Sequence, residues 1–147
     1  MGTYIRDGRA PIPKKESTSR VMSANKAKNT KPEVALRKAL WATGRQGYRL
    51  HSKQLPGRPD IAFGKKKLAI FINGCFWHRC PTCNLPLPRS NTEFWSNKFN
   101  ANVARDKRKI KALQRIGWRT MTLWECKIAS DPSKSAERIV RVLEKMG

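Results

Sequence analysis

The four cysteines limit the fold of this chain more than any other feature of its sequence. Cys75, Cys80 and Cys83 lie in one short segment, and Cys126 lies well downstream. Thiols stay reduced in the cytosol, so such a cluster there indicates metal binding rather than disulfides. Zinc takes four thiolate or imidazole ligands in a tetrahedron, and two-residue spacings are common in structural sites. The sequence predicts a zinc site that ties one loop to a distant segment; the alternative is buried thiols without a metal.

His78 lies between these cysteines and is the other candidate for a zinc ligand. If it replaced one of them, a cysteine would be left over. We therefore assign four cysteines to zinc and keep His78 for other chemistry. A neutral imidazole near a metal ion can take a proton from an attacking water molecule.

The charge of the chain indicates its partner. Lys and Arg number 32 against 10 Asp and Glu, which gives a formal net charge of +22 on 147 residues. So large a charge on a short chain favours a polyanionic partner, most commonly nucleic acid. The alternatives are a ribosomal or chromatin-type scaffold and a basic protein of the membrane surface. Charge alone does not distinguish binding DNA from cutting it.

The length is that of one domain with one modest core, which excludes a multi-domain enzyme. The longest apolar stretch, Leu68 to Ile72, is far shorter than the roughly 18–20 residues of a membrane-spanning helix. The first residues show no signal-peptide pattern, so we expect a cytoplasmic, nucleoid-associated protein that does not bind membranes. Residues 1–18 are expected to form a flexible basic arm, with a short helix near 19–27, and residues 19–147 a single domain.

Periodicity and turn residues predict an α/β fold, a small mixed sheet flanked by helices. The predicted elements are a helix over 30–44, strands over 48–51, 60–63 and 68–73, a helix over 90–116, a strand over 118–124 and a last helix from 132. Thr30-x-x-Glu33 and Ser90-x-x-Glu93 have the spacing of capping boxes at the first two helix starts. The strand over 68–73 is apolar on both faces, as in a central buried strand.

Three acidic residues are candidates for chemistry. Asp60 opens a strand beside a second strand, where a carboxylate can hold Mg²⁺ against a phosphate, although an Asp in a turn is the simpler interpretation. Glu33 is explained by its capping box. Asp106 falls on the inward stripe of the 90–116 helix, with Phe99 and Leu113 among its neighbours, and a buried unpaired charge there would be costly.

Large aromatic rings lie on or beside the predicted loops. Phe76 and Trp77 stand inside the cysteine segment, and Phe94 and Trp95 begin the long helix. In a basic protein such rings can stack on bases, whereas the alternative is a place in the core. We expect Phe94 in the core and Phe76 and Trp77 exposed.

Five blocks of sequence, in order, are similar to one known family. They are Leu55-Pro56-Gly57-Arg58-Pro59-Asp60, Gly74-Cys75-Phe76-Trp77-His78, Thr92-Glu93-Phe94-Trp95, Asn102-Val103-x-Arg105-Asp106, and Gly117-Trp118-Arg119 followed by Trp124-Glu125-Cys126. Together they resemble the very short patch repair endonucleases over about residues 19–126. The resemblance implies a fold like that of type II restriction endonucleases with a structural zinc. It also implies a monomeric enzyme that nicks double-stranded DNA 5′ to the T of a T:G mismatch left by deamination of 5-methylcytosine.

The resemblance also implies a role for each matching residue. Asp60 would be the main Mg²⁺ ligand, with the backbone carbonyl of Ile72, and His78 would activate the water. Glu33 and Asp106 would shape the site through the water shell of the metal or through His78. The DNA-binding residues would be Phe76, Trp77 and Trp95, as a wedge from the major groove, and the basic arm, with Met22, on the minor-groove side.

Two departures from the family pattern concern the site. Asn73 stands where the family has a histidine, and an amide donates a hydrogen bond but carries no proton at neutral pH. Cys80 stands where a histidine ligand is familiar, with one extra residue before Cys83, which gives a four-cysteine zinc site. The remaining alternatives are a restriction-type enzyme that cuts both strands and a non-catalytic zinc-stabilised DNA-binding module. Mismatch-repair proteins or a cytosine methyltransferase are candidate partners.

Overall fold

The structure, a computed structural model, describes residues 30–146. The predicted basic arm, the short helix near 19–27 and Met22 lie outside these residues. A four-stranded sheet forms the centre of the fold, with the strands β1 (Arg49–Leu50), β2 (Ile61–Phe63), β3 (Leu68–Asn73) and β4 (Arg119–Trp124) in that order. β1, β2 and β3 pair antiparallel, and β3 and β4 pair parallel. The predicted mixed sheet is therefore confirmed.

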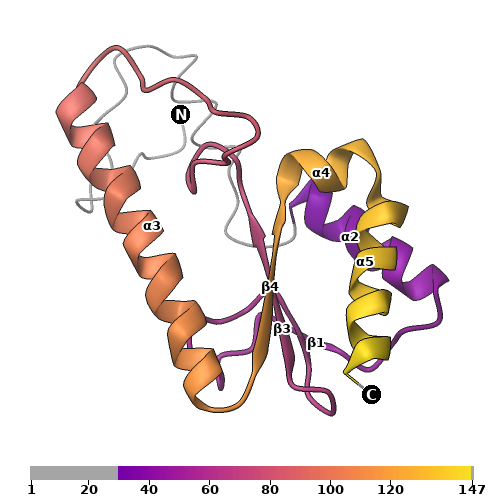
Figure 1. The fold of residues 1–147 in the computed structure, drawn as a ribbon. Helices are drawn as coiled ribbons and strands as arrows, with labels where there is room; N and C mark the ends of the chain where they lie inside the picture. The colour runs from indigo at the N-terminus through magenta and orange to yellow at the C-terminus, as the bar shows by residue number, and fades with distance from the viewer. Residues whose placement is uncertain (1–29, 147) are drawn as a thin grey trace.

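Helices cover both faces of this sheet (Figure 1). α2 (Lys31–Ala42), α4 (Glu125–Ser130) and α5 (Pro132–Lys145) pack together on one face, and α3 (Thr92–Arg115) crosses the other. A parallel strand pair needs such a long crossover, and α3 supplies it between β3 and β4. Within residues 30–146, no helix has the length and apolar composition needed to cross a membrane.

β3 is buried on both faces, as its apolar sequence predicts. Its side chains alternate, so that Ile70 joins the core beneath α2, α4 and α5 and Phe71 joins the smaller core beneath α3. The larger core contains Leu36, Leu40, Ile61, Phe63, Leu68, Ile70, Leu123, Ile128, Ala136, Ile139 and Leu143. β2 pairs with the first half of β3, and β4 pairs along its whole length, including Ile72 and Asn73 at the end that leads into the cysteine segment.

The predicted helix starts differ in outcome. Thr30 and Glu33 form the expected capping box: the Glu33 amide donates to Thr30 Oγ1 at 3.4 Å, and the Thr30 amide donates to Glu33 Oε2 at 3.3 Å. The capping box predicted at Ser90 is wrong. α3 begins at Thr92, after Asn91 adopts a left-handed conformation (φ 55°) without a side-chain cap. This turn takes Ser90 out of the N-cap position, so its spacing to Glu93 has no function in capping.

Three further expectations are corrected. The strand over 48–51 is shortened to Arg49–Leu50, and the half-buried ring of Tyr48 instead packs against Phe63, with centroids 5.5 Å apart. The six-residue helix α4 was not predicted, because so short a helix has too few turns for a periodic pattern. Phe94 is half-buried and Trp95 takes the core position beside it, 4% exposed.

Candidate active site and cysteine cluster

Asp60 lies at the edge of the sheet, immediately before β2. Its Oδ2 accepts a hydrogen bond of 2.7 Å from the amide of Ile72 on β3. Burial raises the pKa of the Asp60 carboxyl above its usual value, and the nearby charge of Glu33 acts in the same direction. The hydrogen bond from the Ile72 amide and the nearby His51 and Lys109 side chains oppose this rise in pKa. The Asp60 carboxylate is thus held in a position where a nearby positive charge would stabilise its ionised form.

Glu33 has two functions in the structure. Oε2 belongs to the capping box, whereas Oε1 is hydrogen-bonded to His51 Nε2 and lies 3.4 Å from Arg37 Nη1. The residue is only 2% exposed. The cap alone therefore does not explain Glu33, because its second oxygen faces the groups around Asp60.

His51 is the residue of this site that has no role in the sequence predictions. It follows β1 in a left-handed conformation (φ 48°), and its amide donates to the carbonyl of Asp60 at 3.1 Å. The ligand atoms of Glu33, His51 and Asp60 all lie within 4.8 Å of one another. A lone histidine in a loop has no local pattern; the available signals were that it is one of two histidines and lies just before the Leu55–Asp60 block.

His78 and Asp106 form a second imidazole–carboxylate pair. His78 Nδ1 lies 2.6 Å from Asp106 Oδ2, and Asp106 projects from the middle of α3. Asn102, one turn earlier on α3, donates from Nδ2 to the carbonyl of Trp77 at 3.1 Å, which holds the segment carrying His78 against the helix. The acidic residue that interrupts the inward stripe of α3 is thus paired.

A cleft of about 600 Å³ brings most of the predicted catalytic residues together. It is lined by His51, Gly57, Arg58, Asp60, Phe71, Ile72, Asn73, His78, Asp106 and Lys109. Gly57 lets the loop before β2 pass against α3: it has φ +76°, and a Cβ there would lie 2.7 Å from Cβ of Lys109. The cleft is open, rich in charged groups and wide enough for a phosphate.

The four cysteines meet away from the residues that line this cleft. Their sulfur atoms all lie within 4.8 Å of one another, and Cys80 Sγ is 3.8 Å from Cys126 Sγ. Four Zn–S bonds of about 2.3 Å give tetrahedron edges of about 3.8 Å, so the cluster fits a zinc ion. Burial raises the pKa of the Cys75 thiol. Burial acts the same way at Cys80, but hydrogen bonds from the amides of Cys83 and Thr82 outweigh it and lower the pKa of that thiol to about 7.

The aromatic residues form one cluster beside the cysteine segment. The Phe76 ring lies 5.2 Å from Trp77 and 5.1 Å from Phe99, both edge to face, and Trp95 stacks on Phe99 at 5.6 Å. Phe76 and Trp77 are half-buried, whereas Trp95 is buried. The expectation that Phe76 and Trp77 are exposed is therefore corrected: they are half-buried, as is Phe94, and Trp95 is the buried ring that contacts all three.

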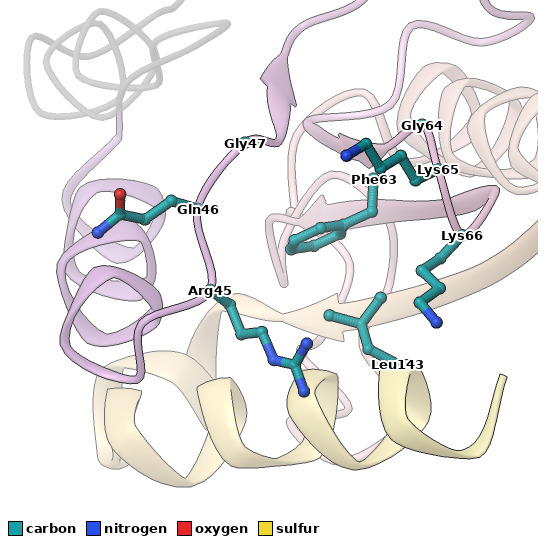
Figure 2. A pocket seen from close by; sticks show the side chains of 8 residues that line it. All are labelled: Arg45, Gln46, Gly47, Phe63, Gly64, Lys65, Lys66 and Leu143. Atoms are coloured by element: carbon teal, nitrogen blue, oxygen red, sulfur yellow. The ribbon is translucent and has the colours of Figure 1, made fainter. Parts of the chain in front are cut away.

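A second hollow lies at the opposite end of β2 (Figure 2). It measures about 240 Å³ and is lined by Arg45, Gln46, Gly47, Phe63, Gly64, Lys65, Lys66 and Leu143. Figure 2 shows the Phe63 ring and the Leu143 side chain lining the space between the three cationic side chains. The lining contains no carboxylate or imidazole, so this hollow lacks the groups that hydrolysis requires.

Comparison with known proteins agrees with this geometry. The family model for the DNA mismatch endonuclease Vsr matches residues 11–84. The chain is 42% identical to the type II nicking enzyme V.XorIIP of Xanthomonas oryzae over 84% of its own length and 90% of that protein. It is 35% identical to the DNA mismatch endonuclease Vsr of Escherichia coli over 92% of its own length and 86% of that protein.

The mixed sheet and the carboxylates and imidazoles gathered at its edge, taken with these relatives, define the class of the protein as a DNA endonuclease. Within that class, the chain belongs to the DNA mismatch endonuclease Vsr family, the very short patch repair endonucleases.

Proposed function

We propose that this endonuclease nicks one strand of duplex DNA on the 5′ side of the T in a T:G mismatch left by deamination of 5-methylcytosine. The observation that carries the proposal is the single cleft that is lined by both Asp60 and the His78–Asp106 pair. Relatives named as a mismatch endonuclease and as nicking enzymes support the substrate and the cleavage of a single strand.

Mg²⁺ is the proposed cofactor, held by the Asp60 carboxylate and the backbone carbonyl of Ile72. The donor set fits, since Mg²⁺ prefers oxygen ligands and binds through one or two carboxylates together with substrate phosphates. The Ile72 amide already fixes Oδ2 of Asp60, which leaves Oδ1 for the ion. When bound, Mg²⁺ polarises the phosphate and lowers the pKa of its bound water.

His78 is the proposed general base. Asp106 binds Nδ1 of its ring, so Nε2 is the nitrogen that takes the proton from the attacking water. Asp106 acts as a positioning residue, because it fixes the tautomer and the direction of the imidazole. Asn73 lines the same cleft and is proposed to donate a hydrogen bond to the phosphate, without the proton transfer that a histidine would allow.

The Cys75, Cys80, Cys83 and Cys126 cluster is proposed to hold a structural zinc. His78 lies between Cys75 and Cys80, so zinc would fix the segment that carries the proposed base. We propose a restriction-endonuclease-like domain over residues 19–147, preceded by a basic arm over 1–18. The four-stranded mixed sheet with helices on both faces is compatible with that fold.

Phe76 and Trp77 are proposed as the wedge that enters the DNA beside the mismatch, and Trp95 as their support. A T:G pair is weakly held, which lowers the cost of unstacking it. The basic arm, with Met22, is proposed to bind the opposite groove. The proposed enzyme acts as a monomer in the cytoplasm, where its DNA lies, with mismatch-repair proteins or a cytosine methyltransferase as candidate partners.

Separate Asp60→Ala and His78→Ala variants test this proposal on a T:G duplex with Mg²⁺. Removal of the metal ligand is expected to slow nicking about a thousandfold or more, and removal of the base about 10²–10⁴-fold. Glu137→Gln, an exposed acidic residue on α5, is the matched control and should nick normally. Unchanged nicking by both site variants would refute the assignment, and a DNA footprint without any cleavage by the wild type would favour the binding-module alternative.

A further inference from the structure

The Glu33, His51 and Asp60 cluster contains a nitrogen ligand that a purely Mg²⁺ site does not need. The three residues of the cluster come from separate parts of the chain: the first turn of α2, the residue after β1, and the residue before β2. The donor atoms lie within 4.8 Å of one another, a spacing that lets three ligands reach one ion. The cluster is therefore a candidate mixed-donor metal site.

The backbone holds these groups in place. His51 keeps a positive φ of 48°, a conformation that side chains rarely adopt and that often marks functional positions. Its amide is bonded to the carbonyl of Asp60, and its ring to Glu33. The side chain of His51 is 16% exposed and that of Glu33 is 3% exposed. A simple ion pair at the surface does not need this burial.

The charges of the cluster also favour a cation. Glu33 and Asp60 bring two carboxylates close together, and Asp60 is already partly desolvated. The His51 ring is hydrogen-bonded to Glu33 Oε1, and its ligand nitrogen lies within 4.8 Å of a carboxylate oxygen of Asp60.

We propose that Glu33, His51 and Asp60 together bind one divalent cation, and that the imidazole of His51 makes this site prefer Mn²⁺ to Mg²⁺. This inference rests on the proposed metal-dependent function and adds His51 as the residue that sets metal preference. Imidazole nitrogen binds first-row transition ions well, whereas Mg²⁺ selects oxygen ligands and water. Mn²⁺ accepts both kinds of donor.

Pulsed electron paramagnetic resonance of bound Mn²⁺ tests the proposal directly, because a coordinated imidazole nitrogen modulates the spin echo. The sample is the zinc-loaded full chain with one equivalent of Mn²⁺, alone and with a T:G duplex made uncleavable at the target bond. The chain has two histidines, so His78→Gln is a complete control for His51→Gln. Labelling histidine with ¹⁵N confirms the source of the signal.

The wild type and His78→Gln are expected to show the ¹⁴N modulation, and His51→Gln to lose it. His51→Gln should also weaken Mn²⁺ binding about tenfold or more and change Mg²⁺ binding far less. The His78→Gln spectrum is decisive even if His51→Gln fails to fold, because His51 is then the only histidine in the chain. Mn²⁺ that binds through Asp60 without ¹⁴N modulation in either state would overturn the role of His51 and leave the proposed nicking function intact. Modulation that vanishes in His78→Gln would also overturn it.

Discussion

Within residues 30–146, two clusters of side chains could hold a metal ion, and they offer different kinds of donor atom. The cysteine cluster gathers four soft sulfur donors that can close a tetrahedron around zinc. The cluster at Asp60 gathers oxygen and nitrogen donors on the wall of an open cleft. A closed set of ligands stabilises a fold, whereas an open set leaves positions for water and substrate. On this basis we propose that the cysteine cluster serves stability and that the cluster at Asp60 serves catalysis.

The two clusters are nevertheless joined by one segment of the chain. Gly74–Asn91 supplies three of the cysteines and also His78, and its carbonyl at Trp77 is held by α3. We therefore expect the cleft to depend on the cysteine cluster but not the reverse. Loss of the cysteine cluster should displace His78, whereas loss of the cleft residues should leave the cysteine cluster intact.

The largest expected effect is that of Cys83→Ser. Structural zinc contributes roughly 10 kcal/mol or more in small zinc domains, which is comparable to the whole stability of a domain of this size. The variant should lose zinc and fail to fold, as measured by metal analysis and circular dichroism. Thr82→Ser, at an exposed neighbouring position, is the control. A folded, zinc-free Cys83→Ser protein would show that the cluster is not structural.

A smaller effect is expected for Trp77→Ala, which removes one ring of the proposed wedge. Stacking of a base on an aromatic ring is worth about 1–3 kcal/mol, or about 5–150-fold. The rate of nicking on T:G relative to T:A duplexes should decrease by a factor within that range, and the zinc content should stay normal. Trp41→Ala is the matched control, because Trp41 on α2 is 60% exposed. An equal fall in both variants would contradict a specific wedge.

Most of the scaffold could be predicted from the sequence because its signals are local. The apolar run Leu68–Asn73, the Thr30 cap and the start of α5 at Asp131-Pro132 each follow from neighbouring residues. The structure adds a side-chain cap there, since Asp131 Oδ1 accepts a hydrogen bond from the Lys134 amide at 3.1 Å. The capping box predicted at Ser90 is wrong because the left-handed turn at Asn91 sets the start of α3 at Thr92. The spacing of Ser90 and Glu93 does not indicate such a turn.

The candidate site was predictable only in part. Three of its residues carried sequence signals. Asp60 stands at the entrance of a predicted strand, His78 stands inside the cysteine segment, and Asp106 interrupts an apolar helix stripe. His51 carried no local pattern, because its partner Glu33 is brought to it only when α2 packs against the sheet. The capping box gives Glu33 a sufficient local role, and no sequence pattern indicates that its second carboxylate oxygen also reaches His51.

The smallest expected effect comes from Glu33→Gln, which separates the cap from the cleft. Glutamine also serves in a capping box, so the cap of α2 should remain. Loss of the buried charge beside His51 and Arg37 should cost about 1–3 kcal/mol of stability, measured by urea unfolding. The charge at the cleft disappears, and nicking should slow about tenfold. Thr30→Ala is the complementary control: it removes the other side of the box and should cost about 1 kcal/mol of stability without a comparable loss of activity. If both variants lose only stability, Glu33 serves the helix alone.

We propose above all that this cleft hydrolyses one bond beside a mismatched T. The most direct measurement compares two duplexes that differ only in one central pair, T:G against C:G, incubated with the protein and Mg²⁺ and resolved by strand. The account predicts a single cut in the T-containing strand on the 5′ side of that T, no cut in the other strand, and no product from C:G. Cleavage of both strands, or equal cutting of the C:G duplex, would contradict it.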